Sequence, residues 1–297
     1  MKYCKILLGD DLITNINFDR HLFFDGAMGS MLQQYGLDTG EPSDMQNLLN
    51  GKVVTEIHKK YIEAGANVLT ANTFGTYSLH YDNVDEIIEA GVNHIKEAIK
   101  QSNVDTANPI LMALDMGPTG QLIEPYGDMT FEECYNVFLQ SVKAGVKAGV
   151  DLILIETMMD LTEMKAAVQA AKTSNLPVIA TMTYDKNGKT MMGTDLKDMA
   201  EMLEDLQVDA LGMNCGFGPE IYENLLPSLS AVTKLPILVQ PNAGLPELVD
   251  GKAHYSMDPK TFAGHMKIMS RHAKLLGGCC GTTPDHIKEL INAVRTA

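Results

Sequence analysis

The sequence predicts an α/β protein, a single (β/α)8 TIM barrel with a short N-terminal extension, over residues 1–297. Eight short apolar runs alternate with eight longer segments of helical periodicity. The runs are continuously apolar, as in parallel strands that are covered on both faces. The repeat covers about 250 residues, the usual size of this barrel. A doubly wound open sheet is the alternative, but no glycine fingerprint for a dinucleotide follows the first strand.

The predicted strands are short runs rich in β-branched and apolar residues. In chain order they are HLFFDG, NVLTANTF, PILMALDMG, DLILIETM, PVIATMTY, ALGMNC, PILVQPN and KLLGGCC. The predicted helices between and after them are Val53–Ala64, Val84–Gln101, Phe131–Ala148, Leu161–Thr173, Leu196–Leu206, Glu220–Val232, Pro259–Ala273 and Pro284–Val294. The residues before Asp25 are expected to cover the bottom of the barrel.

Composition excludes several classes of function. The formal net charge of −15, without a cluster of lysines, disfavours nucleic acid as a partner. No apolar run is long enough to cross a membrane, and the N-terminus has acidic residues where a signal peptide needs apolar ones. We therefore expect a cytoplasmic protein. In that reducing compartment the five cysteines stay thiols, so a cluster of them indicates metal binding or catalysis.

Polar residues and thiols follow most of the predicted strands. In a (β/α)8 barrel the ends of all strands meet at the C-terminal rim, where active sites lie. We therefore expect these side chains to converge on one mouth. They are Asp25, Asn72, Thr73, Asp115, Glu156, Asn214, Cys215, Gln240, Asn242, Cys279 and Cys280.

Three cysteines at this rim predict a metal site. Cys279 and Cys280 are adjacent, and Cys215 precedes Cys279 by 64 residues but by only two strands of the ring. Three thiolates suit Zn²⁺ and leave its fourth position open, which is typical of a catalytic site. Neighbouring glycines would let the chain turn tightly enough for both adjacent thiols to reach one ion. The remaining cysteines, Cys4 and Cys134, are interpreted as small buried hydrophobic residues.

Several motifs together resemble one known family. DGAMGSML, ANTFGT, LILIET, MTYDKNGKTMMGTD, GMNCGFGP, QPNAGLPE and GGCCGTTPDHI occur in one order over nearly the whole chain. In this set the chain resembles the homocysteine S-methyltransferase family, most closely the homocysteine-binding barrel of cobalamin-dependent methionine synthase. The combination of NC-x-x-GP with a later GGCCGT is highly specific.

The resemblance implies roles for particular residues. Cys215, Cys279 and Cys280 would hold zinc as the catalytic centre, with the homocysteine thiol as fourth ligand. Asp25 and Glu156 would bind the substrate ammonium, and the backbone amides around Gly26 and Ala27 its carboxylate. Asn72 and Asn214 are further candidates for substrate binding at the same rim.

The chemistry of these residue types fits that reading. A free thiol has a pKa of about 8.5, so a metal that binds the thiolate makes the attacking species available at neutral pH. Carboxylates around an ammonium, and backbone N–H groups around a carboxylate, recognise an amino acid through charge-assisted hydrogen bonds. The sequence therefore predicts zinc-dependent methyl transfer to homocysteine, which yields methionine.

The source of the methyl group is less well defined. Many relatives carry threonine where this chain has Ala71, which removes one hydrogen bond expected toward the substrate. No methyl-donor site is recognisable before the last residue, Ala297. We therefore expect the donor to be methylcobalamin or another methyl-corrinoid on a partner protein, or a small molecule such as S-methylmethionine. The likeness to methionine synthase favours the corrinoid protein.

Two further classes of function stay open. The chain could be a non-catalytic protein that binds zinc or an amino acid, because such a protein would share every ligand with the enzyme. It could also be a redox protein that uses Cys279 and Cys280, although such dithiols normally have the spacing C-x-x-C.

Overall fold

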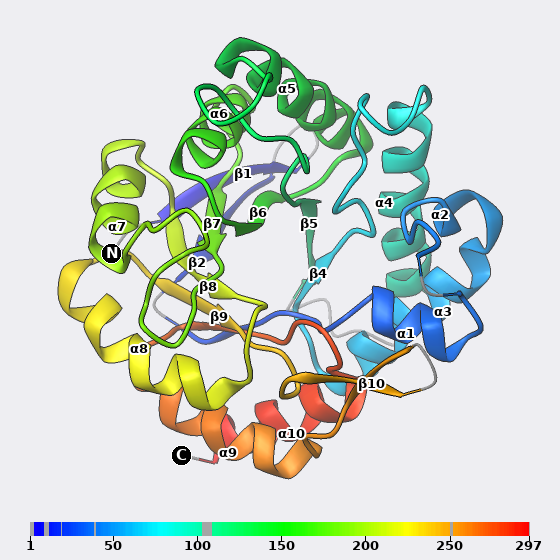
Figure 1. Ribbon diagram of the computed structural model, residues 1–297. Helices are drawn as coiled ribbons and strands as arrows, with labels where there is room; N and C mark the ends of the chain where they lie inside the picture. Colours follow the sequence, from blue (N-terminus) through cyan, green and yellow to red (C-terminus); the bar gives the residue numbers. More distant parts are fainter. Residues whose placement is uncertain are drawn as a thin grey trace.

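A closed barrel of eight parallel strands, surrounded by helices, is the architecture of the chain (Figure 1). The computed structural model describes residues 3–8, 12–18, 20–38, 40–102, 109–249 and 252–296. The strand order is β3-β12-β9-β8-β7-β6-β5-β4, and a parallel bridge between Phe24 and Val68 closes the ring. The predicted barrel is thus confirmed, and the open sheet is wrong.

The elements follow the predicted order. The barrel strands are β3 (Leu22–Phe23), β4 (Val68–Thr70), β5 (Leu111–Met116), β6 (Leu152–Met158), β7 (Val178–Met182), β8 (Ala210–Asn214), β9 (Ile237–Gln240) and β12 (Leu275–Leu276). The outer helices are α3 (Gly51–Ala64), α4 (Val84–Gln101), α5 (Phe131–Ala148), α6 (Leu161–Lys172), α7 (Leu196–Asp205), α8 (Pro219–Val232), α9 (Pro259–Met269) and α10 (Pro284–Arg295). Two short helices missed by the sequence analysis, α1 (Gly29–Gln34) and α2 (Gln46–Leu49), lie between β3 and α3.

Local signals explain where several helices begin. Thr130 and Glu133 form a reciprocal capping box at the start of α5. Asp160, Asp195 and Asp258 each accept backbone N–H groups in the first turn of α6, α7 and α9. These caps satisfy donors that the helix itself leaves free, and they fix where each loop of the C-terminal rim ends.

The barrel interior is apolar near the N-terminal ends of the strands and polar near their C-terminal ends. Alternate residues of a strand point to the same side. The interior cluster contains Val68, Ala113, Leu154, Ile179 and Leu238, together with Leu22, Phe24, Leu152, Ala210 and Leu275. Two positions further along the same strands come Thr70, Asp115, Glu156, Thr181 and Gln240. The strand period thus turns this second set toward the mouth of the barrel.

The N-terminal extension closes the other end. Its strands β1 (Tyr3–Leu8) and β2 (Leu12–Asn17) form an antiparallel hairpin, which crosses behind the barrel strands in Figure 1. Ile16 and Phe18 are buried in the same interior cluster as Leu22. The extension therefore covers the bottom of the barrel, as predicted.

Polar residues at the starts of three strands tie neighbouring strands together. The side chains of Asn67, Asp151 and Asp209 accept a backbone N–H from a residue of the preceding strand, at 2.7, 2.8 and 2.9 Å. The backbone N–H of each then donates to the carbonyl of that same partner, which is Phe23, Met112 or Val178. These paired hydrogen bonds satisfy backbone N–H and C=O groups at the starts of the strands.

Three further features bear on the sequence predictions. Cys134 is fully buried in the outer core, as expected, whereas the side chain of Cys4 lies outside the described residues. A second hairpin, β10 (Pro246–Val249) and β11 (Lys252–Tyr255), follows β9 and was not predicted. Within the part of the chain that the structure describes, no helix has both the length and the apolar character that a bilayer span requires.

Candidate metal and substrate site

Three thiols meet at the C-terminal rim. Cys215 follows β8, and Cys279 and Cys280 follow β12. The Sγ atom of Cys280 lies 4.0 Å from that of Cys215 and 4.0 Å from that of Cys279. All three sulfurs lie within 4.8 Å of one another, and the described residues contain no second cluster of three or more His, Cys, Asp or Glu side chains with ligand atoms this close.

Backbone geometry brings the thiols together. Cys215 has a φ of 60° and Gly216 a φ of 65°, so the chain turns sharply after β8. Tyr222 of α8 donates to the carbonyl of Cys215 at 2.8 Å and holds this turn. After β12, the N–H of Cys279 donates to Pro241 at 2.9 Å, and Gly281 has a φ of 79°. The expectation that glycine permits the second turn is therefore confirmed at Gly281.

The thiol cluster fits a tetrahedral metal ion. A zinc ion with sulfur ligands at 2.3 Å requires sulfurs about 3.8 Å apart, close to the 4.0 Å observed. Hydrogen bonds from the thiols of Cys215 and Cys279, with a further one from Tyr255, lower the pKa of Cys280 well below its ordinary value. These contacts favour the thiolate form of Cys280, which is the form that binds a soft cation.

A cavity of about 230 Å³ lies beside the thiols. Its wall includes the loop after β3, the ends of β4 to β6, and the three cysteines. The predicted site residues on this wall are Gly26, Ala27, Asn72, Glu156, Cys215, Cys279 and Cys280. The volume suits a small amino acid, and thiol and carboxyl groups face it together.

β6 is irregular at Glu156 and Thr157, and both residues line the cavity. The pairing of β6 with β7 shifts register between Ile155 and Met158, and Thr157 has a φ of 62°. Such bulges re-aim side chains next to active sites, and left-handed backbone at a β-branched residue is strained.

Asn214 holds this strained turn. Its Oδ1 accepts from the N–H of Thr157 at 2.8 Å and from Thr181 at 2.7 Å, and its Nδ2 donates to Thr157 Oγ1 at 2.7 Å. The side chain is fully buried and does not line the cavity. Asn214 thus positions the turn next to Glu156, and its predicted substrate contact stays a prediction.

The carboxyl groups near the cavity are poorly solvated. Asp25 is 2% exposed and accepts from the N–H of Thr70 at 3.0 Å and from its hydroxyl at 2.8 Å. Burial raises the pKa of Asp25 to about 7, although the Thr70 hydrogen bonds oppose the shift. Burial, with Cys280 and Asp25 nearby, raises the pKa of Glu156 to about 8. These groups become easier to ionise when a cation binds next to them.

The loop after β3 is held by polar contacts from the far end of the chain. The N–H of Ala27 donates to Thr282 Oγ1 at 3.2 Å, and Tyr61 donates to the Ala27 carbonyl at 2.8 Å. A Cβ at Gly26 would lie 2.5 Å from Thr282 Oγ1, so glycine allows this close approach. The Ala27 amide is therefore already engaged in this structure.

Besides Asn214, two predicted site residues are partly or wholly set back from the cavity. Asp25 lies behind the cavity wall and contacts it through Thr70. The amide nitrogen of Asn72 donates to Ser43 at 2.7 Å and to Asn47 at 3.1 Å, so it braces the loop before α2. Substrate contacts by both residues stay predictions.

Sequence reasoning missed some of the surroundings. Asp115 was placed at the rim but not assigned to the substrate, although its two-residue spacing from Ala113 indicates the interior. The β10–β11 hairpin brings Tyr255 onto Gly281, beside the cysteines. An Asp-Gly pair between two short runs is a hairpin signal that could have located it.

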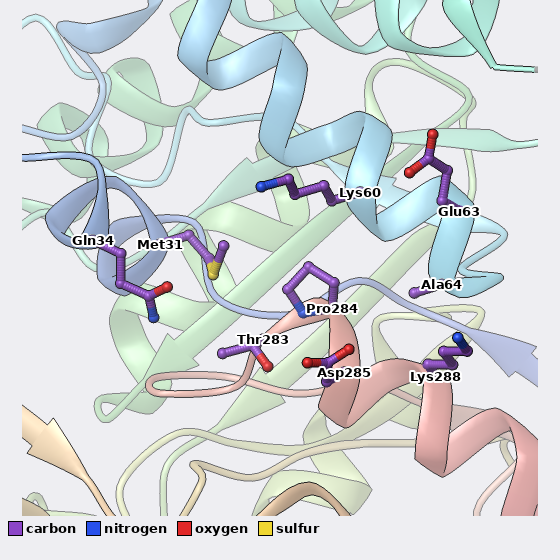
Figure 2. A pocket seen from close by; sticks show the side chains of 9 residues that line it. All are labelled: Met31, Gln34, Lys60, Glu63, Ala64, Thr283, Pro284, Asp285 and Lys288. Atoms are coloured by element: carbon purple, nitrogen blue, oxygen red, sulfur yellow. The ribbon is translucent and has the colours of Figure 1, made fainter.

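A second, larger cavity of about 410 Å³ lies between α1, α3 and α10. Figure 2 shows Lys60 and Glu63 of α3 and Asp285 and Lys288 of α10 on its wall. Two cations and two anions line it, and none of its lining residues is a cysteine. Unlike the smaller cavity, it has no thiol on its wall.

Comparisons with known proteins agree with this geometry. The sequence profile described as Homocysteine S-methyltransferase matches residues 22–294. The chain is 32% identical to a methionine synthase of Mycobacterium leprae over 91% of its own length, and 31% identical to that of Mycobacterium tuberculosis over 98%. It spans only about a quarter of these two relatives, 24% and 26%.

A solved structure extends the likeness to three dimensions. The apo form of the homocysteine methyltransferase MmuM from Escherichia coli is similar with a TM-score of 0.74 and 25% identity. The match covers 92% of this chain and 95% of that chain.

Proposed function

Because the chain belongs to the homocysteine S-methyltransferase family, we propose that it transfers a methyl group to the sulfur of homocysteine and releases methionine. The observation that carries the proposal is the group of three thiols beside a cavity with carboxyl groups on its wall. The thiols suit a soft cation, and the cavity suits a small amino acid.

Zinc is the proposed metal, held by Cys215, Cys279 and Cys280. When bound there, it supplies a Lewis acid that keeps the substrate sulfur as a thiolate at neutral pH. The separation of the three sulfurs supports this assignment, as does the open side that they present to the cavity.

The protein's own side chains would orient the amino acid. Glu156, with Asp25 behind the wall, would compensate the substrate ammonium, and backbone N–H groups of the loop around Gly26 would bind its carboxylate. With both ends held, the sulfur faces the thiol cluster. The substrate thiol would lose its proton first. The new S–C bond would then form as the bond between the methyl carbon and its donor breaks, with the electron pair of that bond remaining on the donor.

For the donor, we propose methylcobalamin or another methyl-corrinoid carried by a separate partner protein. The methionine synthase relatives, about four times longer than the matched segment, support a modular arrangement. Exposed apolar side chains on loops of the C-terminal rim would suit a corrinoid face or its carrier. They are Phe74, Leu79, Leu122, Tyr126, Met191, Met192 and Leu245.

A small-molecule donor such as S-methylmethionine is the second candidate. The likeness to the homocysteine methyltransferase of E. coli, with a TM-score of 0.74, favours it. The non-catalytic alternative predicts zinc and homocysteine binding without turnover. A cytoplasmic location stays an expectation from the sequence.

Turnover with a panel of donors tests these proposals. Zinc-loaded protein is given homocysteine with free methylcobalamin, S-methylmethionine or a methylated corrinoid protein, and methionine is measured. Cys280→Ser protein is the matched control, because it lacks one proposed ligand. Methionine formed with the corrinoid protein supports the partner hypothesis. Methionine formed only with S-methylmethionine supports the small-molecule donor instead. No methionine from any donor, with homocysteine bound, supports the non-catalytic alternative.

A further inference from the structure

Asp115 presents an unassigned carboxyl group to the cavity. It is the second-to-last residue of β5, in register with the interior residues Leu111 and Ala113. It lines the same cavity as Glu156 and the thiols, and it is only 8% exposed. The hydroxyl of Thr73 accepts from its N–H at 3.2 Å and donates to its carbonyl at 2.9 Å. The backbone that carries this carboxyl is therefore fixed.

One carboxyl oxygen of Asp115 lacks a partner among the residues that the structure describes. Its buried Oδ1 has no hydrogen bond in the described part of the chain. A buried polar atom without a partner costs free energy, so it is rare unless a ligand or water satisfies it. Thr70 satisfies the carboxyl of Asp25, whereas no group in the described ranges satisfies the buried Oδ1 of Asp115.

The surroundings of Asp115 are negative. Burial, and then the charge of Glu156, raise the pKa of Asp115 well above its ordinary value. No lysine or arginine within the described ranges forms an ion pair with Asp25, Asp115 or Glu156. A cationic ligand would therefore meet no competing ion pair at these carboxyl groups, and its charge would favour their ionised form.

We infer that Asp115 is a specificity-determining residue that, together with Glu156, accepts hydrogen bonds from the α-ammonium of the substrate. The inference rests on the proposed function, which supplies an amino-acid thiol. An ammonium has three N–H donors, and acceptors from β5 and β6 reach it from neighbouring strands. The pair would select against thiols of the same length that lack an amino group.

Binding measurements on zinc-loaded protein test this role. Calorimetry compares homocysteine with 4-sulfanylbutanoate, which has the same thiol and carboxylate but no ammonium. In the wild type we expect homocysteine to bind more tightly. Asp115→Ala should reduce that preference at least about tenfold, because hydrogen bonds to charged groups are the strong ones. Asp128→Asn removes an exposed acid from the loop after β5 and should leave the preference unchanged.

The ratio of the two dissociation constants separates the possible failures. A preference that Asp115→Ala leaves unchanged overturns the inference, and so does equal weakening of both ligands. If wild-type protein binds neither thiol, the proposed function fails instead. If Asp115→Ala does not fold, Asp115→Asn is assessed by the same ratio, because it retains the shape of the side chain.

Discussion

Replacing Asp25 with asparagine should stabilise the protein without its substrate and weaken homocysteine binding. Asp25 is 2% exposed, and burial raises its pKa from 3.8 to about 7. A group whose pKa is higher in the folded state contributes stability below its unfolded pKa and loses it as the pH rises through the folded value. Here that loss falls between about pH 4 and pH 7, so the native carboxylate is a cost above pH 7.

The size of the effect follows from those two pKa values. The difference between 3.8 and about 7 corresponds to roughly 4 kcal/mol when the carboxyl is fully ionised. Asparagine keeps both contacts with Thr70, since its Oδ1 can accept the N–H and its Nδ2 can donate to the hydroxyl. We expect Asp25→Asn to be about 2–4 kcal/mol more stable at pH 8 and nearly equal to wild type at pH 4.

Thermal unfolding at several pH values, with and without homocysteine, measures this. At pH 8 the substrate-free variant should melt about 4–8 °C above wild type. Saturating homocysteine should stabilise wild type more than the variant, because the ammonium compensates the carboxylate. Asp151→Asn is the matched control. It replaces another buried acid, with a pKa raised by burial to about 6, at the far end of the barrel.

Two results would refute the reasoning. One is a stability difference between Asp25→Asn and wild type that does not change with pH, since the effect is assigned to ionisation. The other is an equal loss of homocysteine affinity in Asp151→Asn, which would show that the effect on binding is not local to the cavity.

Three further predictions concern the metal, the strained turn and the core. Metal analysis should show that Cys215→Ser has lost most of its zinc and that Cys134→Ala retains it. Acid should release zinc from wild type, because the ligands must be deprotonated. Full zinc occupancy in Cys215→Ser would contradict this. Asn214→Ala should lower the free energy of unfolding, measured in urea, by about 2–4 kcal/mol, because Thr157 loses its hydrogen-bond partners. The variant should also bind homocysteine more weakly, with a smaller effect on zinc binding. Unchanged homocysteine affinity would argue against this role. His58 is fully buried, and burial lowers its pKa from 6.5 to about 3, so stability falls as the pH drops below 6.5. Between pH 7 and pH 5, His58→Leu should lose about 2 kcal/mol less of its free energy of unfolding than wild type. If stability falls equally with pH in both proteins, protonation of His58 is not the cause.

The sequence determined the fold and the convergence of three thiols at one rim. Helical periodicity located all eight outer helices, each within four residues of its observed bounds, because an amphipathic helix carries its packing face in its own spacing. Cys215, Cys279 and Cys280 were predicted to meet because parallel strands of one barrel end at the same rim, and the structure brings their sulfurs within 4.8 Å.

Tertiary structure alone decided which polar rim residues face the cavity. From sequence, Asn214 and Glu156 are equivalent polar residues at strand ends. In the fold, Glu156 lines the cavity beside the register shift in β6 and the left-handed Thr157, while Asn214 is buried against that turn. Likewise Thr70 satisfies the carboxyl of Asp25, whereas Oδ1 of Asp115 has no partner within the described part of the chain. These outcomes depend on hydrogen bonds between residues about 40 to 60 positions apart, which no local pattern of residue types encodes.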